Sequence, residues 1–125
     1  MEKKKIMVID DEKDFLKMVK LNLEEAGAYE VKTEDNSENA FNAIKVFKPD
    51  IILVDVMMPG MDGGDIVHKL ESDDELKDIP VVFVTATVTK GEVSAAGGVI
   101  GKRNFIAKPV GAQELIYSIE KYLNK

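Results

Sequence analysis

The stretch Ile51-Ile52-Leu53-Val54-Asp55 is a run of four apolar residues that ends in a carboxylate. Continuous Val, Ile and Leu runs of this length are typical of parallel strands that are buried on both faces. Three more short apolar runs end in polar residues: Ile6 to Ile9 before Asp10-Asp11, Val81 to Val84 before Thr85, and Phe105 to Ala107 before Lys108-Pro109. Because an open α/β sheet binds its ligand at the carboxyl ends of its strands, these polar groups are expected to converge there.

Segments with helical spacing separate the apolar runs. The first is expected over Glu12 to Ala26, ends at Gly27, and places on one stripe Phe15, Val19, Leu23 and Ala26. Asn36 or Ser37 can cap a second helix, whose apolar face holds Ala40, Phe41, Ile44 and Phe47. A third helix begins with Ile66, Val67 and Leu70, and the last covers Ala112 to Leu123.

Two elements give weaker signals. Tyr29 to Thr33 is short and less hydrophobic than the other runs, as an edge strand would be, whereas glycines dilute the helical pattern around Val93 to Ala96, so only a short fourth helix is expected there. Strand and helix nevertheless alternate five times with short connections. The economical architecture is an α/β fold with a five-stranded parallel sheet and helices on both faces.

Composition sets limits on function. A chain of 125 residues fits a single domain over 1–125. The net charge of -6 argues against a nucleic-acid partner, because such binding depends mainly on neutralising phosphates. Cysteine is absent, which excludes disulfides, and no apolar stretch approaches the length of a membrane span. A cytoplasmic protein without membrane contact is expected.

The polar strand ends predict a phosphoryl-transfer site. Two carboxylates about 4 Å apart repel by about 4 kcal/mol at an effective dielectric constant near 20, so the clustered acids Asp10, Asp11 and Asp55 need a cation. Mg²⁺ suits them because it takes oxygen ligands and leaves positions open for phosphate oxygens. Asp55 is the expected nucleophile, while the Thr85 hydroxyl and the Lys108 ammonium can stabilise the phosphate oxygens.

These motifs resemble those of the receiver domain of two-component response regulators, the chemotaxis-type family. The resemblance covers residues 4–124 and is carried, in matching order and spacing, by Met7 to Asp11, Leu53 to Gly63, Val84-Thr85-Ala86 and Ala107-Lys108-Pro109. It implies a flavodoxin-like (βα)5 fold and a signalling switch that accepts a phosphoryl group from a histidine kinase or phosphotransfer protein. The output would be a changed surface over the fourth helix, fifth strand and fifth helix, which controls a downstream protein as a monomer or a phosphorylation-dependent dimer.

The resemblance also implies roles for individual residues. Asp55 is the phosphoacceptor, Asp11, Asp55 and the backbone carbonyl of Met57 ligate Mg²⁺, and Asp10 assists through water. Pro109 follows a cis peptide bond. Thr85 and the ring of Phe105 move together in the switch, and Met57 and Thr87 occupy positions that tune dephosphorylation. Because Met57 is apolar and cannot position the attacking water, a persistent phosphoryl state is expected.

Three other hypotheses about the function remain open beside that of a stand-alone receiver. The chain is also compatible with a receiver from a longer regulator whose output module binds DNA or carries an enzyme. A phosphorylation-independent interaction module would not need the intact acids, Thr85 and Lys108. A magnesium-dependent phosphatase would usually carry a second acid where this chain has Met57. The glycine-rich, basic run from Ala95 to Arg103 departs from many receivers, and its spacing does not fit a P-loop.

Overall fold

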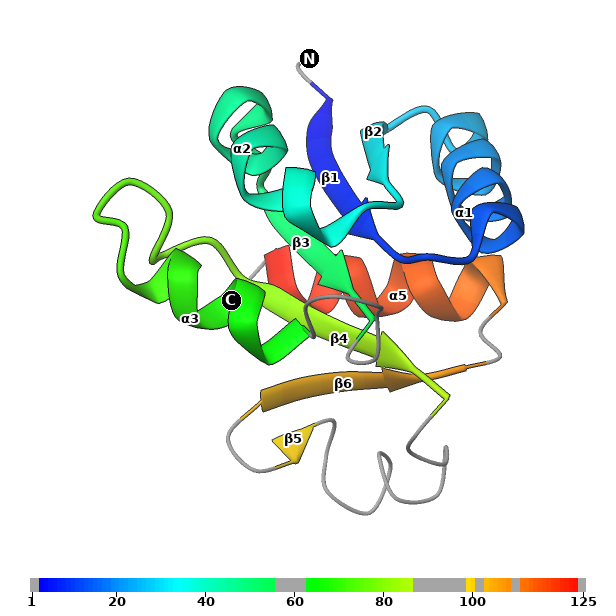
Figure 1. The fold of residues 1–125 in the computed structure, drawn as a ribbon. Coiled ribbons are helices and arrows are strands. Elements are labelled where there is room, and N and C mark those ends of the chain that lie inside the picture. Colours follow the sequence, from blue (N-terminus) through cyan, green and yellow to red (C-terminus); the bar gives the residue numbers. More distant parts are fainter. Residues whose placement is uncertain (1–2, 56–62, 87–98, 101–102, 109–110, 124–125) are drawn as a thin grey trace.

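The computed structural model of the chain describes residues 3–55, 63–86, 99–100, 103–108 and 111–123. Within them, the strands form one sheet in the order β2-β1-β3-β4-β6-β5 (Figure 1). The five parallel strands are β1 (Lys4–Ile9), β2 (Tyr29–Glu34), β3 (Ile51–Val54), β4 (Val81–Thr85) and β6 (Arg103–Ala107). The predicted five-stranded parallel sheet is confirmed. The sequence did not predict β5 (Val99–Ile100), which pairs antiparallel with β6.

The described part of the chain contains four helices, of which three lie between strands and the last follows β6. They are α1 (Lys13–Glu25), α2 (Ser37–Phe47), α3 (Gly63–Glu71) and α5 (Ala112–Leu123). Each matches a predicted helix, and the bounds of α5 are those expected from its apolar stripe. The expected short fourth helix around Val93 to Ala96 lies outside the described residues. None of the described helices has the length and apolar composition needed to cross a membrane.

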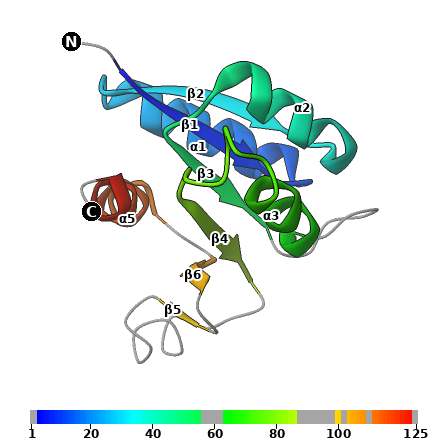
Figure 2. The same ribbon diagram turned by 90° about the vertical axis from the view of Figure 1, so that its left-hand side faces the viewer.

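The sheet separates two apolar clusters, because successive side chains of a strand point to opposite faces. Figure 2 shows α5 and α3 on opposite sides of the strands. The cluster shared with α1 and α5 contains Val8, Leu53, Val84, Val19 and Ile119 among its buried members. The cluster shared with α2 and α3 contains Ile9, Val54, Phe83, Ile44 and Ile66. Burial on both faces explains why these strands are continuously apolar in sequence.

Local sequence signals set the helix ends. The Asn36 side chain caps α2 by accepting a hydrogen bond from the backbone N–H of Glu38 at 2.8 Å, as one of the two predicted caps. Gly27 follows α1 with a φ of 86°, a conformation that glycine adopts without steric cost. One detail of the α1 stripe was wrong. Ala26 is exposed beyond the helix end, and Leu16 is buried with Val19 and Leu23 instead.

Candidate phosphoryl-transfer site

Backbone hydrogen bonds extend the sheet pairing to the first polar residue after three strands. The N–H of Asp10 donates to the carbonyl of Glu34 at 3.1 Å, and the N–H of Asp55 donates to the carbonyl of Ile9 at 3.0 Å. At the ends of the paired strands β4 and β6, the N–H of Lys108 donates to the carbonyl of Thr85 at 2.9 Å. The side chains therefore start from positions that the sheet holds fixed.

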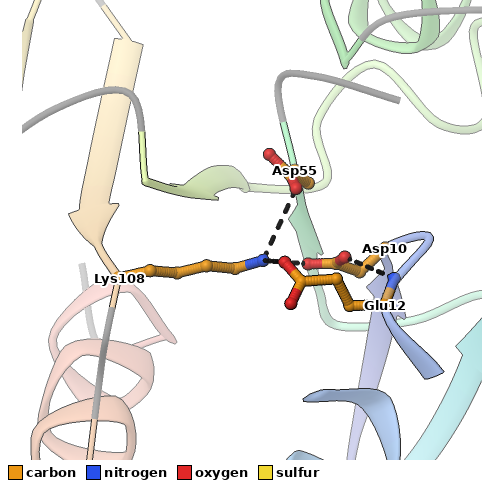
Figure 3. Close-up of polar contacts among 4 residues, drawn as sticks. All are labelled: Asp10, Glu12, Asp55 and Lys108. Carbon is orange, nitrogen blue, oxygen red and sulfur yellow. Dashed lines mark hydrogen bonds and ion pairs between the residues drawn. The ribbon is translucent and has the colours of Figure 1, made fainter. Parts of the chain in front are cut away.

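The Lys108 ammonium joins the two sides of this site (Figure 3). Its Nζ lies 2.6 Å from Asp10 Oδ2 and 3.5 Å from Asp55 Oδ2. Asp10 is 1% exposed and Asp55 is 8% exposed, so both carboxylates are largely removed from water. The predicted convergence of these three residues is thus present in the structure.

The start of α1 supplies two contacts that sequence reasoning missed. Glu12 Oε1 lies 2.9 Å from Lys108 Nζ, and the Phe15 ring centroid lies 4.3 Å from the same nitrogen. The backbone N–H of Glu12 also donates to Asp10 Oδ1 at 2.9 Å, which leaves Asp10 Oδ2 for Lys108. The sequence predicts Glu12 as the start of a helix and Phe15 as a core residue. The one signal for a site role is the position of Glu12 directly after the acid pair Asp10-Asp11.

Burial and charge act in opposite directions on the two central groups. Burial raises the pKa of Asp10, and this effect outweighs the hydrogen bonds from Lys108 and from the Glu12 backbone, which lower it. Burial also opposes the charge on Lys108, but its hydrogen bonds to Asp10 and Glu12 prevail and raise its pKa. Lys108 is also stabilised in its charged form by the nearby charges of Asp10 and Asp55. The site carries an excess of negative charge.

Three carboxylates are placed to share a cation. Asp10, Asp11 and Asp55 each offer an oxygen, and these oxygens lie within 4.8 Å of one another. Asp10 and Asp55 are buried, whereas Asp11 is exposed. An all-oxygen donor set with an open side fits a hard divalent cation such as Mg²⁺, which usually keeps several waters.

The remaining predicted residues fall into two groups. Thr85 is 1% exposed at the end of β4, where its carbonyl already bonds the Lys108 backbone. Phe105 is half-buried in β6, and its ring centroid lies 5.2 Å from that of Phe83. The other predicted residues lie outside the described part of the chain, namely Met57, Thr87 and Pro109.

Comparison with known families matches most of the chain to one model. Residues 6–120 match the family described as the response regulator receiver domain. The polar-differentiation response regulator DivK of Brucella anthropi is 34% identical over 121 residues, which cover 96% of this chain and 96% of DivK. The phosphate regulon transcriptional regulatory protein PhoB of Pseudomonas aeruginosa is 35% identical over 124 residues. That alignment covers 98% of this chain but 52% of PhoB, so the chain spans about half of that relative.

A solved structure shows the same fold at lower identity. The receiver domain of the sensor histidine kinase PA1611 from Pseudomonas aeruginosa superposes with a TM-score of 0.81 at 18% identity. The match covers 99% of this chain and 100% of that domain. That structure holds a magnesium ion coordinated in its active-site cleft.

Proposed function

This chain belongs to the response regulator receiver family of two-component systems, and we propose that it is a phosphorylation-dependent switch in which Asp55 accepts a phosphoryl group. The observation that carries the proposal is the meeting of Asp55, Asp10 and Lys108 at the carboxyl ends of β3, β1 and β6. A binding module that worked without phosphorylation would have no use for buried acids held against one ammonium.

The chemistry proposed for Asp55 is in-line phosphoryl transfer. One Asp55 carboxylate oxygen forms the new bond to phosphorus as the bond from phosphorus to the donor nitrogen of a phosphohistidine breaks, and that nitrogen keeps the electron pair. Lys108 lies 3.5 Å from Asp55 Oδ2 and can stabilise the charge on the transferred group. The Thr85 hydroxyl is proposed to donate to a phosphoryl oxygen once the group is in place. Water later hydrolyses the acyl phosphate, slowly if Met57 does not position it.

Magnesium is the cofactor that the donor set favours. Asp10, Asp11 and Asp55 would hold it, with the backbone carbonyl of Met57 as a proposed further ligand. When bound, the ion would offset the excess negative charge and present an electrophilic centre to phosphate oxygens. The chain's own part is to keep Asp55 oriented through its backbone bond to Ile9 and to keep Asp10 oriented through the Glu12 N–H.

The output is proposed to pass through β6 and α5 to a downstream protein. Phe105 lies in β6 against Phe83, two residues before Ala107, which pairs with Thr85. A shift of the Thr85 hydroxyl toward a phosphoryl group would change the packing behind it, and the Phe105 ring would respond. The surface so altered would include the fourth helix, whose expected residues lie outside the described part of the chain. Dimerisation on phosphorylation is one form that this output can take.

The upstream partner is proposed to be a histidine kinase or phosphotransfer protein. The alignment to nearly all of DivK fits a stand-alone switch, and the alignment to half of PhoB fits the receiver part of a longer transcriptional regulator. The proposed phosphoryl chemistry is the same in both arrangements.

The proposal is tested by intact mass spectrometry after incubation with acetyl phosphate and Mg²⁺. The wild-type protein is expected to gain one phosphoryl group, and Asp55→Asn to gain none. Asp50→Asn is the matched control, because Asp50 precedes β3 as Asp55 follows it and accepts a hydrogen bond from the Lys5 backbone at 2.7 Å. It should be labelled like the wild type. An adduct that forms equally in Asp55→Asn, or no adduct in the wild type across the time course, would contradict the proposal.

A further inference from the structure

The three donors of the Lys108 ammonium are already used in the structure. A lysine ammonium has three N–H groups and no acceptor. Lys108 Nζ donates to Asp10 Oδ2 at 2.6 Å, to Glu12 Oε1 at 2.9 Å and to Asp55 Oδ2 at 3.5 Å. A phosphoryl oxygen on Asp55 can therefore receive a hydrogen bond from Lys108 in two ways. It can replace the 3.5 Å contact to Asp55 itself, which is the longest of the three, or one of the shorter contacts to Asp10 and Glu12.

Exposure distinguishes the three carboxylates. The side chains of Asp10 and Asp55 are 1% and 10% exposed, whereas that of Glu12 is 63% exposed. Water can solvate Glu12 as soon as it leaves Lys108, whereas Asp10 is buried and would then depend for its counter-charge on the proposed Mg²⁺ alone, which it shares with Asp11 and Asp55. Of the two short contacts of Lys108, the one to Glu12 can thus be exchanged at the smaller cost.

The Glu12 side chain does not cap the helix that it precedes, although its backbone carbonyl accepts a hydrogen bond from the Leu16 N–H at 3.1 Å. Glu12 occupies the N-cap position of α1, yet its side chain makes no capping hydrogen bond. At the same position of α2, Asn36 caps the Glu38 N–H at 2.8 Å. The Glu12 side chain instead extends to Lys108, where the Phe15 ring packs against the same ammonium. Its position is explained by the lysine rather than by helix stability.

We propose that Glu12 is a positioning residue that holds Lys108 in the unphosphorylated protein and is replaced by a phosphoryl oxygen when Asp55 is modified. Competition between Glu12 and the phosphoryl group for one N–H donor weakens the site's affinity for that group. Glu12 thereby sets how readily the switch turns on. This inference rests on the proposed function, since it assumes that Asp55 carries the phosphoryl group.

The test measures the affinity for fluoroberyllate, a non-covalent mimic of a phosphoryl group, by calorimetry in the presence of Mg²⁺. Glu12→Ala frees one donor of Lys108 and is expected to bind fluoroberyllate about twofold to fivefold more tightly than the wild type, the upper part of the range for an exposed ion pair. Glu12→Gln should lie between them, because its amide oxygen can still accept. Asp14→Ala is the matched control, because it removes an exposed acid from the same helical turn and should leave the affinity within twofold, about the resolution of such a comparison.

A second readout separates positioning from a general effect on folding. The ¹⁵Nζ resonance of Lys108, recorded without fluoroberyllate, should move in Glu12→Ala and stay in place in Asp14→Ala. Equal affinities of Glu12→Ala and the wild type, or an equal gain in Asp14→Ala, would overturn the inference while leaving the proposed function intact. A wild-type protein that neither binds fluoroberyllate nor reacts with acetyl phosphate would overturn both.

Discussion

The middle of the sheet is apolar on both faces, whereas the carboxyl ends of the same strands bury Asp10, Asp55 and Thr85. Both regions are closed to water, but they differ in what closure does to them. In the middle, removing apolar side chains from water stabilises the fold. At the strand ends, the same removal raises the pKa of Asp10 and leaves its charged form disfavoured. Burial in the first region therefore stabilises the fold, whereas burial in the second opposes the charged form of an acid of the proposed phosphoryl-transfer site.

The largest effect is expected where an apolar side chain is deleted from the middle of the sheet. Leu53 is 1% exposed in β3, so Leu53→Ala should lower the free energy of unfolding by about 2–5 kcal/mol. Leu21→Ala is the matched control, because Leu21 is 59% exposed on α1 and should change it by less than about 0.5 kcal/mol. Urea denaturation measures both. Similar losses in the two variants would show that burial in this sheet is not what stabilises the fold.

A smaller effect on the free energy of unfolding is expected where a largely buried tyrosine makes a hydrogen bond between two elements. The Tyr29 hydroxyl donates to Glu120 Oε1 at 2.9 Å and so links β2 to α5. Tyr29→Phe should lower the free energy of unfolding at pH 7 by about 1–2 kcal/mol, because it removes a hydrogen bond to a carboxylate. Tyr117→Phe, at a residue 74% exposed, should leave it nearly unchanged.

The same tyrosine predicts a pH dependence. Burial, together with the hydrogen bond and charge of Glu120, raises the pKa of Tyr29 from 10.0 to about 12. Between these values the unfolded chain loses the proton and the folded protein keeps it, so stability falls as pH rises. Denaturation from pH 9 upward should show a shallower decline in Tyr29→Phe than in the wild type or Tyr117→Phe. Equal declines of the free energy of unfolding in all three proteins would show that Tyr29 does not contribute to this pH dependence.

The smallest and opposite effect is expected at the strand ends. Asp10→Asn removes a charge that burial disfavours and keeps one oxygen, which can accept from the Glu12 N–H or from Lys108 but not from both, while Lys108 retains Glu12 and Asp55. At pH 7 without Mg²⁺, we expect an unchanged free energy of unfolding or a gain of about 1 kcal/mol. Asp50→Asn, at an exposed acid, should show no gain. A loss of more than about 2 kcal/mol in Asp10→Asn would mean that this acid stabilises the fold after all.

The sequence predicted the sheet well because burial on both faces leaves a simple pattern. Ile51 to Val54 has no polar interruption, and the adjacent Asp55 marks where the strand ends. The apolar stripe of α5 is equally clear. The strand Val99–Ile100 could not be predicted, because two residues between glycines carry no periodicity and its pairing depends on β6.

The site was predictable in its strand-end members and not in its contacts from α1. Asp10, Asp55 and Lys108 follow from topology, since parallel strands bring their carboxyl ends to one edge. The role of Glu12 depends on which way one flexible side chain turns at a helix start. That direction is decided by a lysine 96 positions away in sequence, and no local pattern records it.

The identity of the phosphorylated residue is tested most directly by trapping the acyl phosphate in the wild-type protein. After incubation with acetyl phosphate and Mg²⁺, borohydride reduces an aspartyl phosphate to homoserine, and peptide mass spectrometry locates the altered residue. The account predicts homoserine at position 55 alone, formed only when acetyl phosphate and Mg²⁺ are both present before the borohydride is added. Homoserine at Asp10 or Asp11, or a phosphorylated protein with an unaltered Asp55, would contradict it.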